Sequence, residues 1–147
     1  MPLSVINLLI HAMITFAMTG IIWFVHLIHY PVMNALDWQR ETFEKIHWQK
    51  TMKIAVIMLI LELGTGILFV LFHPVKIPSS LPISGLLLIV LIWVNTWWMC
   101  VPSHCQLKQQ YNENSLQKLM KANKWRAILW SLRSVIIFYS LLIFLHS

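Results

Sequence analysis

Four histidines lie near the ends of apolar segments. His26 and His29 close the first segment three residues apart, His47 precedes the second segment and His104 follows the third. In a bundle whose helices alternate in direction, these imidazoles come to a similar depth, and four-helix bundles build metal and cofactor sites from inward side chains. Imidazoles suit iron, zinc or copper, and two imidazoles across a gap suit haem. The four histidines are candidates for cofactor binding and metal ligation; alternatively, they are polar residues at a membrane interface.

Two charged residues lie deep inside apolar segments. Glu62 is near the middle of the second segment, and Arg133 lies well inside the fourth. A charge at the centre of a bilayer costs about 2.5 to 3.5 kcal/mol on insertion scales, so each needs a partner. We predict a Glu62–Arg133 ion pair, with Asn95 of the third segment completing its hydrogen bonds. As catalytic candidates, these three residues would orient a substrate or move a proton; alternatively, the pair only fixes helix packing.

Polar side chains form a stripe along the first apolar segment. At 100° per residue, His11, Thr15, Thr19, His26 and His29 fall within an arc of about 80°. Polar groups find no partners in hydrocarbon, so this stripe must face other protein or a water-filled cavity. It either hydrogen-bonds neighbouring helices or lines a pathway or a site.

Two tryptophans lie at the end of the third segment. Trp97 and Trp98 stand beside Cys100 and Pro102. Tryptophan is enriched at membrane interfaces, which is one explanation for this pair. The other is that the two rings wall a pocket for a flat hydrophobic ligand.

Four apolar segments must hold these residues. They run approximately over 5–30, 51–72, 82–101 and 125–145, each close to the roughly 20 residues that a helix needs to cross a bilayer. The 147 residues are 59% hydrophobic and 11% charged, whereas about a quarter of a soluble domain is charged. The segments lack the alternation of a membrane β-strand. The sequence predicts an all-α integral membrane protein, with one up-down four-helix bundle over 1–147.

Positive charges predict the orientation, because lysine and arginine in short loops resist translocation. Lysine and arginine cluster in two connections. The connection between segments one and two contains Arg40, Lys45 and Lys50, and the connection between segments three and four, with the start of segment four, contains Lys108, Lys118, Lys121, Lys124 and Arg126. We therefore expect both long connections in the cytoplasm and both termini on the outer side, with a bacterial inner membrane as the simplest location. Anionic lipids and topology account for the net charge of +6, so no nucleic-acid partner is expected.

Short motifs in all four segments resemble those of other membrane proteins. They are WFVHLIHYP, FEKIHWQK leading to LELGTG, VPSHCQL and ANKWRAILWSLR. They resemble an uncharacterised group of small bacterial four-helix membrane proteins and, more distantly, the anthrone-oxygenase-like family. In that family a proline follows the first span, a Pro-x-Asn-type motif follows the third, and a tryptophan with a downstream arginine marks the fourth. Comparable places are filled here by Pro31, Pro102, Trp130 and Arg133.

The resemblance implies oxygenation of polycyclic aromatic substrates in a membrane pocket. The chain departs from the anthrone-oxygenase-like family in carrying His29, His47 and His104. A weaker similarity is to the four-helix, haem-containing protoporphyrinogen oxidase, which also places a histidine on its first span.

These features together predict a membrane-embedded oxidoreductase, similar to oxygenases, that acts on a lipophilic aromatic or isoprenoid molecule. The histidines would hold a metal or haem near the cytoplasmic face, while Glu62 and Arg133 would set the electrostatics of the pocket. The alternative is a small transporter or ion pathway, or an accessory structural subunit in which the ion pair specifies packing. Membrane lipids are expected partners in every case, and a homo-oligomer is compatible with each.

Overall fold

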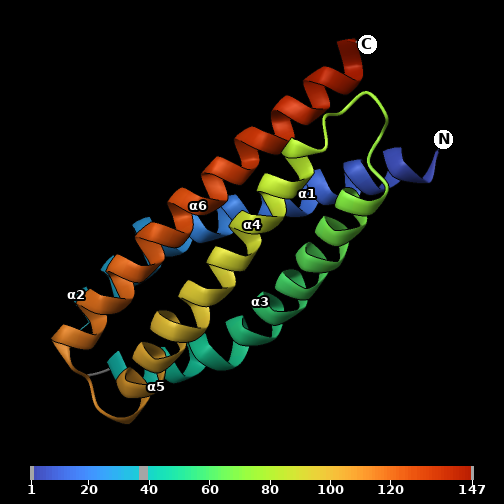
Figure 1. Ribbon diagram of the computed structural model, residues 1–147. Coiled ribbons are helices and arrows are strands. Elements are labelled where there is room, and N and C mark those ends of the chain that lie inside the picture. Colours follow the sequence, from blue (N-terminus) through green and yellow to red (C-terminus); the bar gives the residue numbers. More distant parts are fainter. Residues whose placement is uncertain (1, 37–39, 147) are drawn as a thin grey trace.

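Four long helical spans make up the computed structural model, which describes residues 2–36 and 40–146 (Figure 1). Each span is long and apolar enough to cross a membrane, and no strand occurs within the described residues. The spans are Leu3–Ala35, Thr42–Leu71, Ser80–Gln109 and Glu113–His146. The predicted all-α, four-helix membrane class is thereby confirmed.

The first and third spans are each divided by one turn of π-helix. The first consists of α1 (Leu3–Phe24), η1 (Val25–His29) and α2 (Tyr30–Ala35). The third consists of α4 (Ser80–Asn95), η2 (Thr96–Cys100) and α5 (Val101–Gln109). The second and fourth spans are the continuous helices α3 (Arg40–Leu71) and α6 (Glu113–His146).

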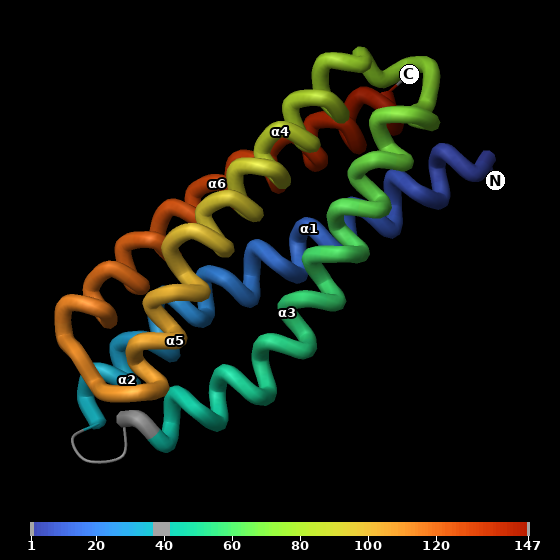
Figure 2. The backbone as a smooth tube through the Cα atoms, turned by 60° about the horizontal axis from the view of Figure 1, so that its bottom comes forward, coloured from blue at the N-terminus to red at the C-terminus, as the bar shows by residue number. Residues whose placement is uncertain are grey.

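The four spans alternate in direction, and both termini lie at the same end of the bundle (Figure 1). Helix α1 packs against α3 and α6, and α4 packs against the same two helices, so the spans form a closed ring. At the opposite end, α2 and α5 lie beside the starts of α6 and α3, as Figure 2 shows. We call this the α2–α5 end.

Helices α3 and α6 begin well before the apolar segments predicted at 51–72 and 125–145. Their added turns contain Glu, Lys and Gln, which are good helix formers. Hydropathy marks only the part of a helix that can lie in hydrocarbon, so it underestimates helices that continue beyond it.

The two π-helical turns come directly before prolines. The N–H of Tyr30 bonds to the carbonyl of Val25, and the N–H of Val101 bonds to that of Thr96, each five residues back. Proline occupies the next position in both spans, as Pro31 and Pro102. Because proline has no N–H and its ring clashes with the carbonyl four residues earlier, a wider turn accommodates it without breaking the helix.

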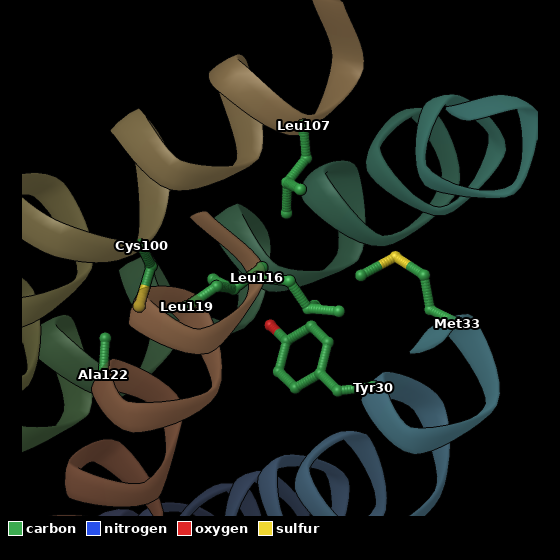
Figure 3. Packing of buried hydrophobic residues seen from close by; sticks show 7 residues of the cluster. All are labelled: Tyr30, Met33, Cys100, Leu107, Leu116, Leu119 and Ala122. Atoms are coloured by element: carbon green, nitrogen blue, oxygen red, sulfur yellow. The ribbon is translucent and has the colours of Figure 1, made fainter. Parts of the chain in front are cut away.

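The interior of the bundle holds polar groups as well as apolar clusters, whereas large apolar side chains cover much of the outside. At the α2–α5 end, Tyr30 and Met33 of α2 point toward Leu116 and Leu119 of α6 (Figure 3). Buried polar residues deeper in the bundle include His11, Thr15, Glu62 and Arg133. This distribution suits a protein whose outer surface contacts lipid.

Candidate functional site

The predicted ion pair is present in the interior. An Arg133 guanidinium nitrogen lies 2.5 Å from Glu62 Oε1, and both side chains are 0% exposed. Glu62 comes from α3 and Arg133 from α6, so the pair joins two spans far apart in sequence. Pairing lowers the cost of holding either charge away from water.

Side chains of α1 and α3 add hydrogen bonds to this pair, while Glu62 Oε2 and Arg133 Nε and Nη1 have no partner among the described residues. Thr15 donates to Glu62 Oε1 at 2.7 Å, and Arg133 donates to His11 Nε2 at 3.1 Å. Because arginine has only donors, His11 Nε2 must accept, which places the imidazole proton on Nδ1. That nitrogen then donates to Thr65 Oγ1 at 2.8 Å, and Thr65 donates to the Leu61 carbonyl. The polar stripe of α1 therefore faces protein, as predicted.

Asn95 does not take part in these bonds, contrary to the prediction. Its amide nitrogen lies 3.9 Å from the Met99 sulfur, and its amide oxygen lies 3.6 Å from the Cys100 sulfur. Asn95 is the last residue of α4, directly before η2, so it lies closer to the α2–α5 end than Glu62 does. Position within an apolar segment gave only an approximate depth, which was not accurate enough to separate Asn95 from Glu62.

Three of the four predicted histidines come together at the α2–α5 end. The rings of His29 and His47 are stacked with centroids 3.7 Å apart, and His47 lies 5.9 Å from His104. His104 Nδ1 is 2.5 Å from Glu44 Oε1, and its Nε2 is 3.4 Å from the Tyr30 hydroxyl. The cluster therefore combines three imidazoles, a carboxylate and a phenol from three spans.

His26 lies outside this cluster, which corrects the predicted set. Its ring packs edge-on against Trp23, and among the described residues no ring contact joins it to the other histidines. The reason is that both His26 and His29 lie in η1. In a π-helical turn each residue rotates by less than the 100° of an α-helix, so residues three apart no longer share one face.

Sequence reasoning missed Glu44 and Tyr30. Glu44 stands three residues before His47 on α3, and this Glu-x-x-His spacing puts both side chains on one helix face. That spacing was the available signal for the carboxylate. Tyr30 carried no comparable signal, because its approach to His104 depends on how α2 and α5 are both placed against α3.

The histidine cluster borders a cavity of about 90 Å³ inside the ring of helices. Met18, Ile22, Leu59 and Trp97 line it toward the middle of the bundle. Its polar lining consists of Tyr30, His47, Thr51, Thr96, His104, Asn123 and Arg126. From His47 to Leu59 the lining extends three turns, or about 18 Å, along α3. The cavity is therefore largely apolar, with most of its polar side chains at the α2–α5 end.

The two π-helical turns lie beside this cavity. Helix α3 packs against α1 and α4 in the part of the bundle toward the termini, and against α2 and α5 at the α2–α5 end. Residues of both turns, Val25 of η1 and Thr96, Trp97 and Cys100 of η2, contribute to the lining. Turns of π-helix recur at functional sites, where they change the direction of side chains. Their position here marks the cavity as the candidate site.

The two tryptophans of η2 have different surroundings. Trp97 lines the cavity and is 55% exposed, while Trp98 is 81% exposed and lies on the outer surface. Adjacent residues on a helical turn cannot both face inward. The predicted pocket wall therefore includes Trp97, and Trp98 has the exposure expected of an interfacial ring.

Within the described residues, no group of three or more His, Cys, Asp or Glu side chains is arranged to hold a metal ion. The closest imidazoles, those of His29 and His47, meet face to face, so their ring nitrogens do not converge on one point. Iron, zinc, copper or haem stays a prediction from the sequence, and we base no step on it.

No protein-family model, curated protein or solved structure matches the chain. The resemblances drawn from short motifs therefore also stay predictions. What the fold and site define is a class: an integral membrane four-helix bundle with a largely apolar internal cavity that has most of its polar side chains at the α2–α5 end.

Proposed function

We propose that the protein binds a lipophilic small molecule in the central cavity and acts on it as a membrane-embedded enzyme. The observation that carries the proposal is the two-ended lining: Leu59 and Trp97 toward the middle of the bundle, His47 and His104 at the α2–α5 end. Ligand sites are typically apolar cavities with a few converging polar groups. A molecule that partitions into lipid would place its apolar part inward and its reactive group against the imidazoles.

The residues at the polar end are suited to moving protons. Imidazole exchanges protons close to neutral pH. Contact with Glu44 at Nδ1 fixes the orientation of the His104 ring, which leaves Nε2 directed toward Tyr30. A base oriented by a third group is the arrangement that general acid–base catalysis uses. We assign His104 as the proton-transfer group and Glu44 as a positioning residue.

Oxidoreduction of an aromatic or isoprenoid molecule is the reaction class that we propose for this site. Oxidation of a hydroxyl group on such a molecule to a carbonyl releases two electrons and two protons. The electrons would pass to an external electron acceptor such as a quinone, and His104 would take up one proton while the other leaves to water.

The binding step is tested with a photoreactive naphthoquinone that carries a diazirine on a short isoprenoid tail. We expect peptide mapping to find label on residues that line the cavity. Ala55 lines the cavity, so Ala55→Phe should reduce labelling several-fold by filling the space. Ile60→Phe on the same helix is the matched control, because Ile60 is 56% exposed on the outer surface. Labelling spread over the outer surface and unchanged by Ala55→Phe would reject the proposal.

A specific observation also favours an ion pathway as the second candidate. Polar contacts continue from the ion pair along α1 and α6: the Thr19 and Ser134 hydroxyls are 2.7 Å apart, and Trp23 donates to Ser131 at 2.9 Å. A chain of hydrogen-bonding groups through the bundle is what proton transfer requires. Proton flux into liposomes that contain the protein, and loss of that flux in His11→Ala, would support this candidate. Flux equal to that of empty liposomes would eliminate it.

A further inference from the structure

Arg126 of α6 lines the cavity and is only 8% exposed. Its Nη1 has a weak contact with the Cys100 sulfur at 3.7 Å, and its buried Nε has no hydrogen-bond partner. Among the described residues, no carboxylate oxygen lies within 4.0 Å of this guanidinium. Arg126 therefore has a buried positive charge without a protein counter-ion.

The bundle treats its two buried arginines differently. Arg133 is paired with Glu62. At the α2–α5 end, the buried carboxylate of Glu44 contacts His104 instead of Arg126. A buried charge without a counter-ion is costly, so Arg126 is expected to have a partner that the described residues do not supply.

A second unpartnered group lies one turn away. The amide oxygen of Asn123 is buried and accepts no hydrogen bond, while its nitrogen donates to the Ile22 carbonyl at 3.4 Å. Asn123 and Arg126 are three residues apart on α6, and both line the cavity. Arg126 therefore offers donors to the oxyanion of a head group, and the Asn123 oxygen offers an acceptor to a hydroxyl group, such as that of a singly protonated phosphate.

From these observations we infer that the ligand is an amphipathic anion. Its carboxylate or phosphate head group binds Arg126, and the first carbons of its apolar chain lie beside Ile22. Because the cavity holds only about 90 Å³, the rest of the chain leaves it past Ile54 and Trp97, which line the cavity and are 60% and 55% exposed. Guanidinium groups bind both kinds of oxyanion through paired hydrogen bonds. This inference rests on the proposed function, because it names the substrate class of the same cavity.

The test uses three competitors with the same farnesyl chain: farnesyl phosphate, farnesoic acid and farnesol. Each competes with the photoreactive naphthoquinone for labelling of the purified protein. We expect one or both anions to compete at least about tenfold more strongly than the neutral alcohol, since hydrogen bonds to charged groups are the stronger ones. The ranking of phosphate against carboxylate identifies the head group. Inorganic phosphate alone should not compete, because it lacks the apolar chain.

Variants of Arg126 then assign the effect to this residue. Arg126→Gln should remove the advantage of the anions and leave competition by farnesol unchanged, which also shows that the cavity is intact. Arg126→Lys retains the charge and should keep part of the advantage. If Arg126→Gln fails to fold, the inference is still tested by Arg126→Lys and by the ranking of the anions against farnesol on the unchanged protein.

Two results distinguish failure of this inference from failure of the proposed function. Equal competition by the anions and farnesol, unaffected by Arg126→Gln, overturns the inference and leaves the proposed function standing. Absence of competition by all three farnesyl compounds, together with labelling that does not map to the cavity, overturns both.

Discussion

At the scale of single residues, the buried charged side chains of this bundle have two kinds of surroundings. The charges of Glu62 and Arg133 compensate each other and are held by Thr15 and His11. At the α2–α5 end, Arg126 instead has no carboxylate partner among the described residues. A charge paired inside the protein stabilises one packing arrangement, whereas an unpaired buried charge is available to a charged ligand. Function is therefore expected around Arg126.

Removal of one partner of the deep ion pair should be strongly destabilising. Glu62→Gln leaves the Arg133 charge buried without a counter-ion, a loss of about 3 to 5 kcal/mol. Glu62→Leu combined with Arg133→Leu should recover most of that loss, because no charge remains buried. Unfolding of the variants by denaturing detergent measures these differences. Equal destabilisation by the single and double changes would show that the pair is not coupled.

The predicted cofactor is tested at the histidines. We expect a Soret band, or stoichiometric iron, zinc or copper, in the purified protein, and loss of this signal in His47→Ala. His26→Ala is the control, because His26 lies outside the ring contacts of the cluster. The Soret band is measured by absorption before and after reduction, and the metal content by elemental analysis of the same sample. A colourless, metal-free protein that takes up neither haem nor metal would contradict the prediction.

At the scale of helices, close packing depends on one small residue. A Cβ at Gly66 of α3 would lie 2.7 Å from Ile89 Cδ1 and 3.4 Å from the His11 ring. Glycine lets α3 approach α1 and α4 closely here, and small residues commonly occupy such helix contacts in membranes. The network around His11 depends on this approach.

Gly66→Ala should therefore be less stable than Gly64→Ala, by up to about 1 kcal/mol, because the Cδ1 end of the buried Ile89 side chain must shift. Gly64→Ala on the same helix is the matched control: nothing lies within 4 Å of its Cβ, so helix propensity makes it neutral or stabilising. Thermal unfolding in detergent compares the two. A Gly66→Ala variant as stable as Gly64→Ala would mean that this contact is loose.

At the scale of the whole molecule, the bundle presents apolar side chains outward and positive charges at the α2–α5 end. Lys108 and Lys118 belong to this end, whereas the loop between α3 and α4 contains only Lys76. Because the positive charges select the cytoplasmic side, the α2–α5 end and its site are predicted to face the cytoplasm.

Cysteine labelling tests this orientation in a chain with both native cysteines changed to alanine. Val75→Cys, in the loop between α3 and α4, should react in intact bacteria with a maleimide that does not cross membranes. Gln117→Cys, near the start of α6, should react only after the cells are opened. Both positions are exposed and neither change alters a charge. The reverse labelling pattern would invert the predicted topology.

The sequence by itself determined the membrane class, the four spans and the Glu62–Arg133 pair. These follow from hydropathy and from the cost of an isolated charge in lipid, which depend on composition along the chain and on approximate depth. The inward stripe of His11 and Thr15 followed for the same reason, since an α-helix has a fixed period.

Only the tertiary structure decided which polar residues meet. The π-helical turns before Pro31 and Pro102 change the rotation of the chain, which separates His26 from the cluster. Helices α2 and α5 both pack against α3, which brings Tyr30 and Glu44 to His104. Hydropathy does not predict how far a helix is rotated about its axis, and a rotation by one residue changes which side chains meet. That Arg126 has no carboxylate partner among the described residues became visible only once those residues were placed around it.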